Sequence, residues 1–63
     1  MDKELRDELM KLTGTGPMSA EINLSLCGND LSKAVARMKI TYPTLEVSQE
    51  ELEKSIDRLT VKY

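Results

Sequence analysis

Few side chains in this sequence have the types and spacing that chemistry requires. Histidine is absent and Cys27 is the single cysteine among 63 residues, which excludes an internal disulfide and a cysteine-based zinc site. No basic cluster is present to activate this thiol, so we expect Cys27 to be a small buried apolar residue. The acidic residues of the segment 50–57 have the spacing of a solvated helix face rather than of a catalytic pair. We therefore expect no enzyme activity and no cofactor.

The turn of residues 13–16, with the sequence T-G-T-G, is the second candidate, because glycine-rich turns can hold phosphate. It is too short for the G-x-G-x-x-G fingerprint, follows no predicted strand and precedes Pro17, which removes an N–H from the helix end. We interpret it as a helix–helix connector whose glycines supply positive φ. Its N–H groups and threonine hydroxyls, together with Met18, are expected to form half of a docking surface.

The amino-acid composition limits the classes of function that remain possible. Hydrophobic residues make up 40% and charged residues 32% of the chain, which is typical of one soluble globular domain. A net charge of −2 and the lack of base-stacking aromatics argue against nucleic acid. Because there is no apolar run of about 20 residues and no apolar leader segment, we expect no membrane association. The unpaired thiol fits a reducing compartment, so we expect a cytoplasmic protein.

Apolar residues recur at helical spacing in four segments. The helices we expect span residues 3–12, 17–27, 31 to about 39–42, and from just after Ser48 to about 59, followed by a frayed tail over residues 60–63. Asp2 is expected to cap the first helix, and Asn29 or Asp30 the third. Gly14 and Gly28 are expected to end the first and second helices, and Pro17 to stand at the first position of the second.

The sharpest local signal precedes the fourth helix. Ser48 and Glu51 have the spacing of a capping box, in which the side chain of each residue bonds the backbone N–H of the other. Val47 and Leu52 stand at the positions of a hydrophobic staple. This pattern predicts a helix that begins directly after Ser48.

Three helices have one apolar face, and the second has two adjacent rows. The single faces consist of Leu5, Leu9 and Leu12 in the first helix, Leu31, Ala34, Val35, Met38 and Tyr42 in the third, and Leu52, Ile56 and Leu59 in the fourth. The two rows of the second helix are Ala20, Leu24 and Cys27, and Met18, Ile22 and Leu26. We expect the first row to face the core and the fourth helix to fold back over the second row. In the alternative, exposed rows mediate a heteromeric contact or a homodimer through Ile22, Leu26, Leu52, Ile56 and Leu59.

The segment 5–39 resembles the ubiquitin-associated (UBA) fold, and most closely the N-terminal domain of bacterial elongation factor Ts. The family's T-G-x-G turn is matched by residues 13–16, and its core and second-turn positions by Met18, Ala20, Leu24, Gly28, Asn29, Asp30, Leu31, Ala34, Val35 and Met38. The resemblance implies an all-α fold: a UBA-like three-helix bundle over residues 3–42 with an additional C-terminal helix over residues 47–60, in one domain of residues 1–63.

The sequence also departs from these families. Asn23 occupies a position where both usually have Ala, and Pro17 replaces an apolar residue. Ile22 and Leu26 stand where elongation factor Ts normally has polar or charged residues. The catalytic core of the exchange factor, with its T-D-F-V segment, is missing from the sequence, so nucleotide exchange is not expected.

The resemblance implies a non-catalytic protein–protein interaction module. Its partner-binding residues would be Thr13, Gly14, Thr15, Gly16 and Met18 of the first turn and Arg37, Met38 and Tyr42 at the end of the third helix. The partner would be an elongation-factor-Tu-like GTPase domain or a ubiquitin-like fold, and the module would act as an adaptor or inhibitor of the phage or mobile-element type. The alternative is a small helical transcriptional regulator whose third helix enters a DNA major groove through Ser32, Lys33, Arg37 and Lys39.

Overall fold

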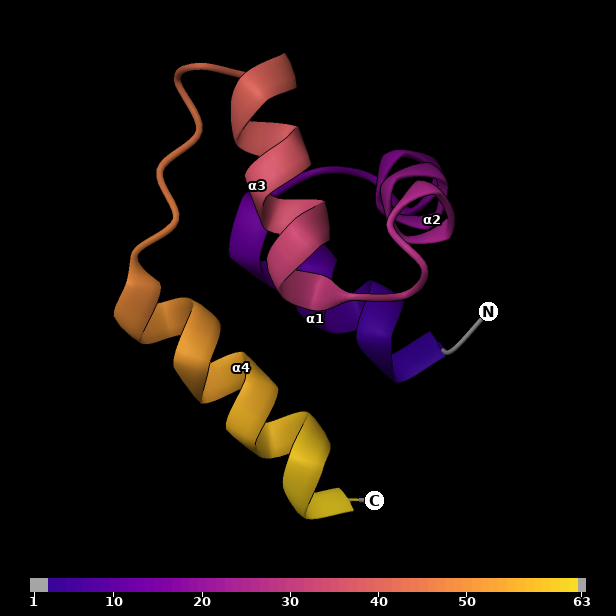
Figure 1. Cartoon of the computed structure of the whole chain (residues 1–63), viewed down its shortest axis with the longest axis vertical. Coiled ribbons are helices and arrows are strands. Elements are labelled where there is room, and N and C mark those ends of the chain that lie inside the picture. Colours follow the sequence, from indigo (N-terminus) through magenta and orange to yellow (C-terminus); the bar gives the residue numbers. More distant parts are fainter. Residues whose placement is uncertain (1–2, 63) are drawn as a thin grey trace.

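Helices account for all the regular secondary structure of the described part of the chain. The structure, a computed structural model, describes residues 3–62, except for the side chains of residues 61 and 62. The helices are α1 (Lys3–Thr13), α2 (Pro17–Leu26), α3 (Leu31–Thr41) and α4 (Gln49–Lys62). This confirms the expected all-α class. Figure 1 shows α1, α2 and α3 grouped together, with α4 on the side of this group away from α2.

Both predicted glycine turns are confirmed. Gly14 has a φ of +68°, and its N–H donates to the carbonyl of Met10 over 2.7 Å, which closes the end of α1. Gly28 has a φ of +63°, and Asn29 follows with a φ of +62°, a conformation that asparagine tolerates better than most side chains. Helix α2 begins at Pro17, as predicted, and ends at Leu26, one residue before the predicted end.

The cap predictions can be resolved further. Asp30 rather than Asn29 caps α3, because its carboxylate accepts from the N–H of Lys33 over 3.1 Å. The N–H of Glu51 donates to the hydroxyl of Ser48 over 3.1 Å, which confirms the predicted start of α4.

The C-terminal tail differs from the prediction. Helix α4 continues to Lys62, so residues 60–62 are helical instead of frayed. The hydroxyl of Thr60 donates to the carbonyl of Ile56 over 2.8 Å within this last part of the helix. The predicted cap Asp2 and the tail residue Tyr63 lie outside the described residues.

The core lies where α1, α2 and α3 meet, and the connector and the start of α4 close it. Its buried apolar residues are Leu9, Ala20, Leu24, Leu31, Ala34, Val35, Met38, Val47 and Leu52. The predicted apolar faces therefore point inward, with two corrections: Tyr42 is 44% exposed, and Cys27 is only half-buried at the edge of the core.

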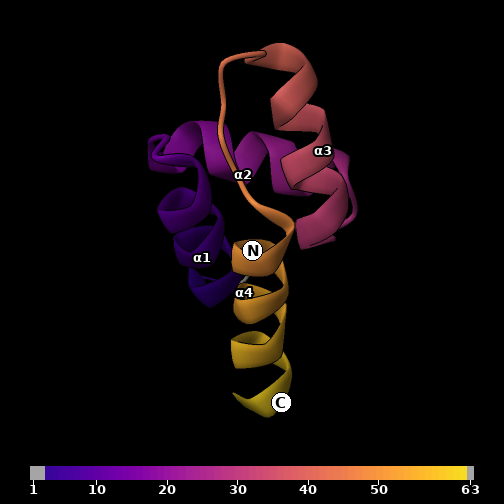
Figure 2. The same cartoon turned by 90° about the vertical axis from the view of Figure 1, so that its left-hand side faces the viewer.

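Helix α4 does not cover the second apolar row of α2, so that prediction is wrong. Helix α4 packs against α1, and Met18, Ile22 and Leu26 remain 73%, 53% and 62% exposed. Figures 1 and 2 show why: the connector of residues 42–48 leaves the end of α3 on the side away from α2 and leads the chain back along α1.

We predict opposite effects for one substitution made at two neighbouring glycines. Gly14→Ser should lower the free energy of unfolding by about 1 kcal/mol, because a side chain is strained at positive φ. Gly16→Ser should raise it by about 0.5 kcal/mol, because Gly16 is the N-cap of α2, has extended backbone angles and provides no side-chain cap.

Urea denaturation of the two variants and the wild type measures both values. A Cβ atom would meet no other atom within 4 Å at either position, so steric clashes do not contribute to the difference between the two variants. Equal effects of the two substitutions would contradict this account of the turn.

Candidate functional site

The outer face of α2 is the most apolar exposed surface of the described residues. Met18, Ile22 and Leu26, here called the α2 outer row, recur at every fourth position and are each more than half exposed. The single charged residue of α2 is Glu21, whose carboxylate bonds the guanidinium of Arg6 in α1 over 3.1 Å. The outer row is therefore continuous along the helix and carries no charge of its own.

The hydroxyl groups of the turn between α1 and α2 form hydrogen bonds within the turn and with the end of α1. The hydroxyl of Thr13 bonds the carbonyl of Leu9 over 2.7 Å and the hydroxyl of Thr15 over 2.8 Å. Both threonines are half-buried, whereas Gly14 and Gly16 are exposed. The threonine side chains thus stabilise the turn itself, and Met18, next to it, projects into solvent.

The end of α3 contributes less to a surface than the sequence predicted. Arg37 is exposed and Tyr42 is 44% exposed, but Met38 is 0% exposed. The assignment of Met38 to the docking surface is therefore wrong. Met38 continues the inward row of Leu31 and Val35 and fills the core.

The structure does not join the two predicted halves of the docking surface. In Figure 2 the connector descends between α1 and α3, so the turn of residues 13–16 and the end of α3 lie on either side of it. The predicted homodimer surface is also divided. Leu52 is buried and Ile56 and Leu59 pack against the core from α4, whereas Ile22 and Leu26 lie on the outside of α2.

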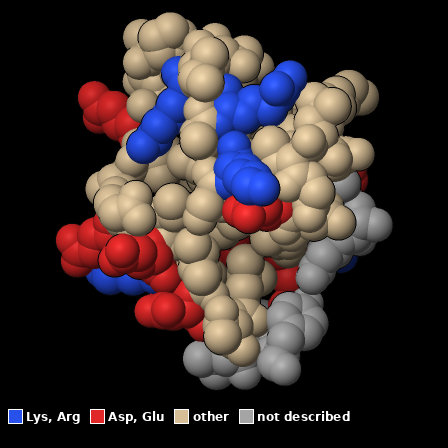
Figure 3. Space-filling model, in the orientation of Figure 1, with Lys and Arg blue, Asp and Glu red and all other residues tan. Residues whose placement is uncertain are grey.

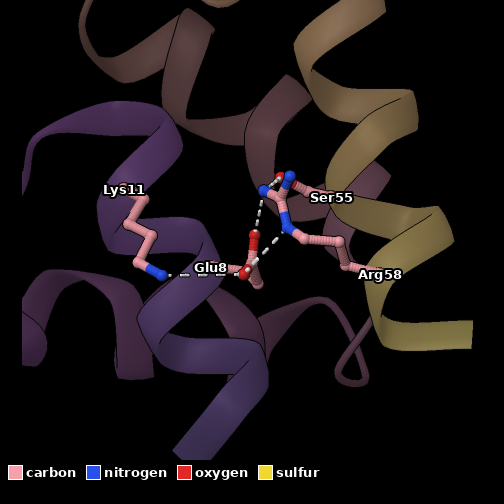
Figure 4. A network of polar contacts seen from close by, with 4 residues as sticks. All are labelled: Glu8, Lys11, Ser55 and Arg58. Atoms are coloured by element: carbon pink, nitrogen blue, oxygen red, sulfur yellow. Dashed lines mark hydrogen bonds and ion pairs between the residues drawn. The ribbon is translucent and has the colours of Figure 1, made fainter. Parts of the chain in front are cut away.

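Figure 4 shows a polar contact between α4 and α1 that we did not predict from the sequence. The carboxylate of Glu8 accepts from Nη2 of Arg58 over 2.6 Å and from Nε over 3.4 Å, and Lys11 approaches it to 4.0 Å. Nη2 of Arg58 also donates to the hydroxyl of Ser55 over 3.1 Å, and Ser55 is 0% exposed. The hydrogen bond from Arg58, aided by the Ser55 hydroxyl and Lys11, holds the pKa of Glu8 below its ordinary value of 4.5, although burial opposes this shift.

The sequence does contain a signal for this contact. Glu8 lies on the apolar stripe of α1, three residues after Leu5 and four before Leu12. Ser55 interrupts the stripe of α4 at the same spacing, three residues after Leu52 and four before Leu59. Two polar residues at equivalent positions in two apolar stripes indicate stripes that face each other.

Residues 3–62 bring together no group of three or more His, Cys, Asp or Glu that could hold a metal ion. None of the helices described has the length and apolarity needed to cross a bilayer. Comparison of the chain with known protein families, curated proteins and solved structures finds no match.

We predict that Glu8→Gln lowers the free energy of unfolding by about 1 kcal/mol at neutral pH, because it removes a charge-assisted hydrogen bond. The folded-state pKa of Glu8 is depressed, so its contribution is present above pH 4.5 and is lost as the pH falls through the folded pKa. The wild type and Glu8→Gln should therefore converge in stability as the pH falls below the folded-state pKa of Glu8.

Denaturation curves measured across this pH range provide the test. Glu46→Gln is the matched control, because Glu46 of the connector is exposed and has no ion pair within 4.0 Å in the described residues, so the comparison isolates the contact with Arg58. A constant difference between wild type and Glu8→Gln at all pH values would contradict the assignment.

Proposed function

We propose that this chain is a non-catalytic protein-interaction module with a UBA-like core, which binds a protein partner through the α2 outer row. The observation that carries the proposal is the exposure of Met18, Ile22 and Leu26 in one uncharged row. Surface helices usually present charged or polar residues to water, as α4 does with Glu50, Glu53 and Asp57.

Physical reasoning supports a protein rather than a small ligand as the occupant. Three large apolar side chains along two turns of helix form a convex ridge, which suits a groove on another protein better than a small molecule. The unbranched side chain of Met18 can adapt to the shape of such a groove. Truncation of one central apolar residue in an interface commonly removes a large share of the binding energy.

The resemblance to elongation factor Ts gives this row added meaning. That family normally has polar or charged residues where this chain has Ile22 and Leu26. Because both positions are exposed here, the apolar residues change the surface and leave the core unaffected. The resemblance suggests an elongation-factor-Tu-like GTPase domain as partner, with a ubiquitin-like fold second, and a stand-alone module of this kind would act as a competitor or adaptor.

The alternative function is DNA binding through α3, which one observation favours. Lys33, Arg37 and Lys39 are exposed along α3 and make no ion pair in the described residues. The net charge of −2 and the acidic residues of α4 oppose it, because duplex affinity depends on phosphate neutralisation.

The test compares two serine substitutions of exposed isoleucines. Ile22→Ser should weaken partner binding by about tenfold or more. Ile40→Ser on α3, where Ile40 is 82% exposed, should leave it unchanged. Both variants should unfold within about 0.5 kcal/mol of the wild type, because neither side chain is in the core.

The probes are purified elongation factor Tu, ubiquitin, and any protein captured from a lysate of the cells that encode the chain. Calorimetric titration measures the affinity, and amide shifts in the labelled chain map the surface. Equal binding by both variants would place the interface elsewhere. Shifts confined to α3 on addition of duplex DNA would favour the alternative.

A further inference from the structure

The charged residues of the described chain divide into paired and unpaired sets. Four cations have a carboxylate within 4.0 Å in the chain itself: Arg6, Lys11, Lys54 and Arg58. The three cations of α3, Lys33, Arg37 and Lys39, are exposed and make no such pair. Helix α3 contains no acidic residue and its cap Asp30 adds a single carboxylate, so the helix with its cap has a net positive charge.

Helix α4 has a corresponding excess of negative charge. Glu53 and Asp57 are exposed and have no ion pair in the described residues, whereas Glu50 bonds Lys54 over 3.5 Å. Glu53 and Asp57 are four residues apart, and so are Lys33 and Arg37. In a helix this spacing corresponds to about 6 Å along the axis, so the two pairs match in length.

Both sets occur on one face of the molecule. Figure 3 shows Lys and Arg gathered over α3 and Asp and Glu gathered over α4. An open groove separates the two helices, and its lining includes Leu31 at the start of α3 and Ile56 and Leu59 of α4. Across this groove the opposite charges do not pair within one chain.

A face that is positive at one end and negative at the other is complementary to itself. Rotation by 180° about an axis that lies in the plane of the face and runs along the groove, between the two helices, brings the α3 of one copy against the α4 of a second copy. The reverse contact forms at the same time, as in every two-fold interface. We propose that a second copy of this chain docks on this face, with Lys33 and Arg37 of each copy against Glu53 and Asp57 of the other.

The centre of this face can also contribute. The groove that lies between the charged helices is lined by the apolar side chains of Leu31, Ile56 and Leu59. Interfaces typically combine an apolar centre with a polar rim. The rim charges set the orientation and the rate of encounter, and they make the dimer sensitive to salt. This surface is separate from the α2 outer row, so a dimer would leave that row free.

Sedimentation equilibrium of the full chain, with charge-reversed variants, tests the proposal. The wild type should dimerise, and raising the salt concentration from about 20 mM to about 300 mM should weaken the dimer about tenfold or more. Arg37→Glu should abolish dimerisation, and so should Glu53→Arg, because each places like charges against each other. The double variant Arg37→Glu/Glu53→Arg should restore it.

Mixing the two single variants gives the sharpest result. One variant then has acidic residues at both ends of the face and the other basic residues at both ends, so the mixture should form a heterodimer although neither variant dimerises alone. Circular dichroism confirms that each variant is folded. If dimerisation returns when the charges of the two positions are exchanged, its loss in the single variants cannot be a result of misfolding.

Three results would overturn the proposal. The first is a wild type that stays monomeric at about 1 mM protein in low salt, a concentration at which even weak dimers form. The second is a dimer that Ile22→Ser abolishes and the charge reversals leave intact, which would assign self-association to α2. The third is a monomer that binds duplex DNA through Arg37, which would assign the α3 cations to nucleic acid.

Discussion

The contact between Glu8 of α1 and Arg58 of α4 determines which surfaces of this chain are covered. Two apolar surfaces compete for α4: the stripe of α1 and the outer row of α2. A purely apolar helix would distinguish poorly between them, because burial of apolar area has no directional preference. Ser55 and Arg58 give α4 a direction, because α1 offers a carboxylate at the matching position. On α2 these groups would meet Ile22 and Leu26: Arg58 would lose its carboxylate partner, and the buried hydroxyl of Ser55 would lose its hydrogen bond at a cost of about 1–3 kcal/mol.

Some features of this fold are determined by residues close together in the sequence, and these features can be predicted from the sequence. Turns and caps depend on neighbours within a few residues, so Gly14, Gly28 and the cap at Ser48 could be located, and the cap of α3 could be narrowed to Asn29 or Asp30. Inward faces follow from helical spacing. The helix against which α4 packs could not be predicted from the apolar stripe of α4 alone. An apolar stripe indicates that one face of a helix is buried, but it does not indicate which surface covers that face. The polar interruptions of the two stripes at Glu8 and Ser55 contain that information.

The candidate site illustrates the same limit. Met38 belongs to a regular inward row, and its spacing alone assigns it to the core, where it is fully buried. The resemblance to UBA-like domains instead placed it on a docking surface, and that residue-by-residue transfer failed at this position. Met18 was assigned to a surface on the same basis and is 73% exposed. A family pattern therefore locates turns in this chain better than it locates contact residues.

The polar groups of α2 explain why its outer row can be covered at little cost. The Nδ2 group of Asn23 donates to the carbonyl of Ser19 over 2.8 Å, and Glu21 is held by Arg6. One polar group of each side chain therefore has a partner within the chain, which reduces the number of hydrogen bonds that a protein covering the row would have to replace. Desolvation of unpaired polar groups is a major cost of forming an interface. On α3, by contrast, Lys33 and Arg37 have no partner in the described chain, and only an oppositely charged surface could cover them favourably. The two faces therefore differ in what they can bind: α2 suits an apolar groove, and α3 requires acidic residues such as those on α4 of a second copy.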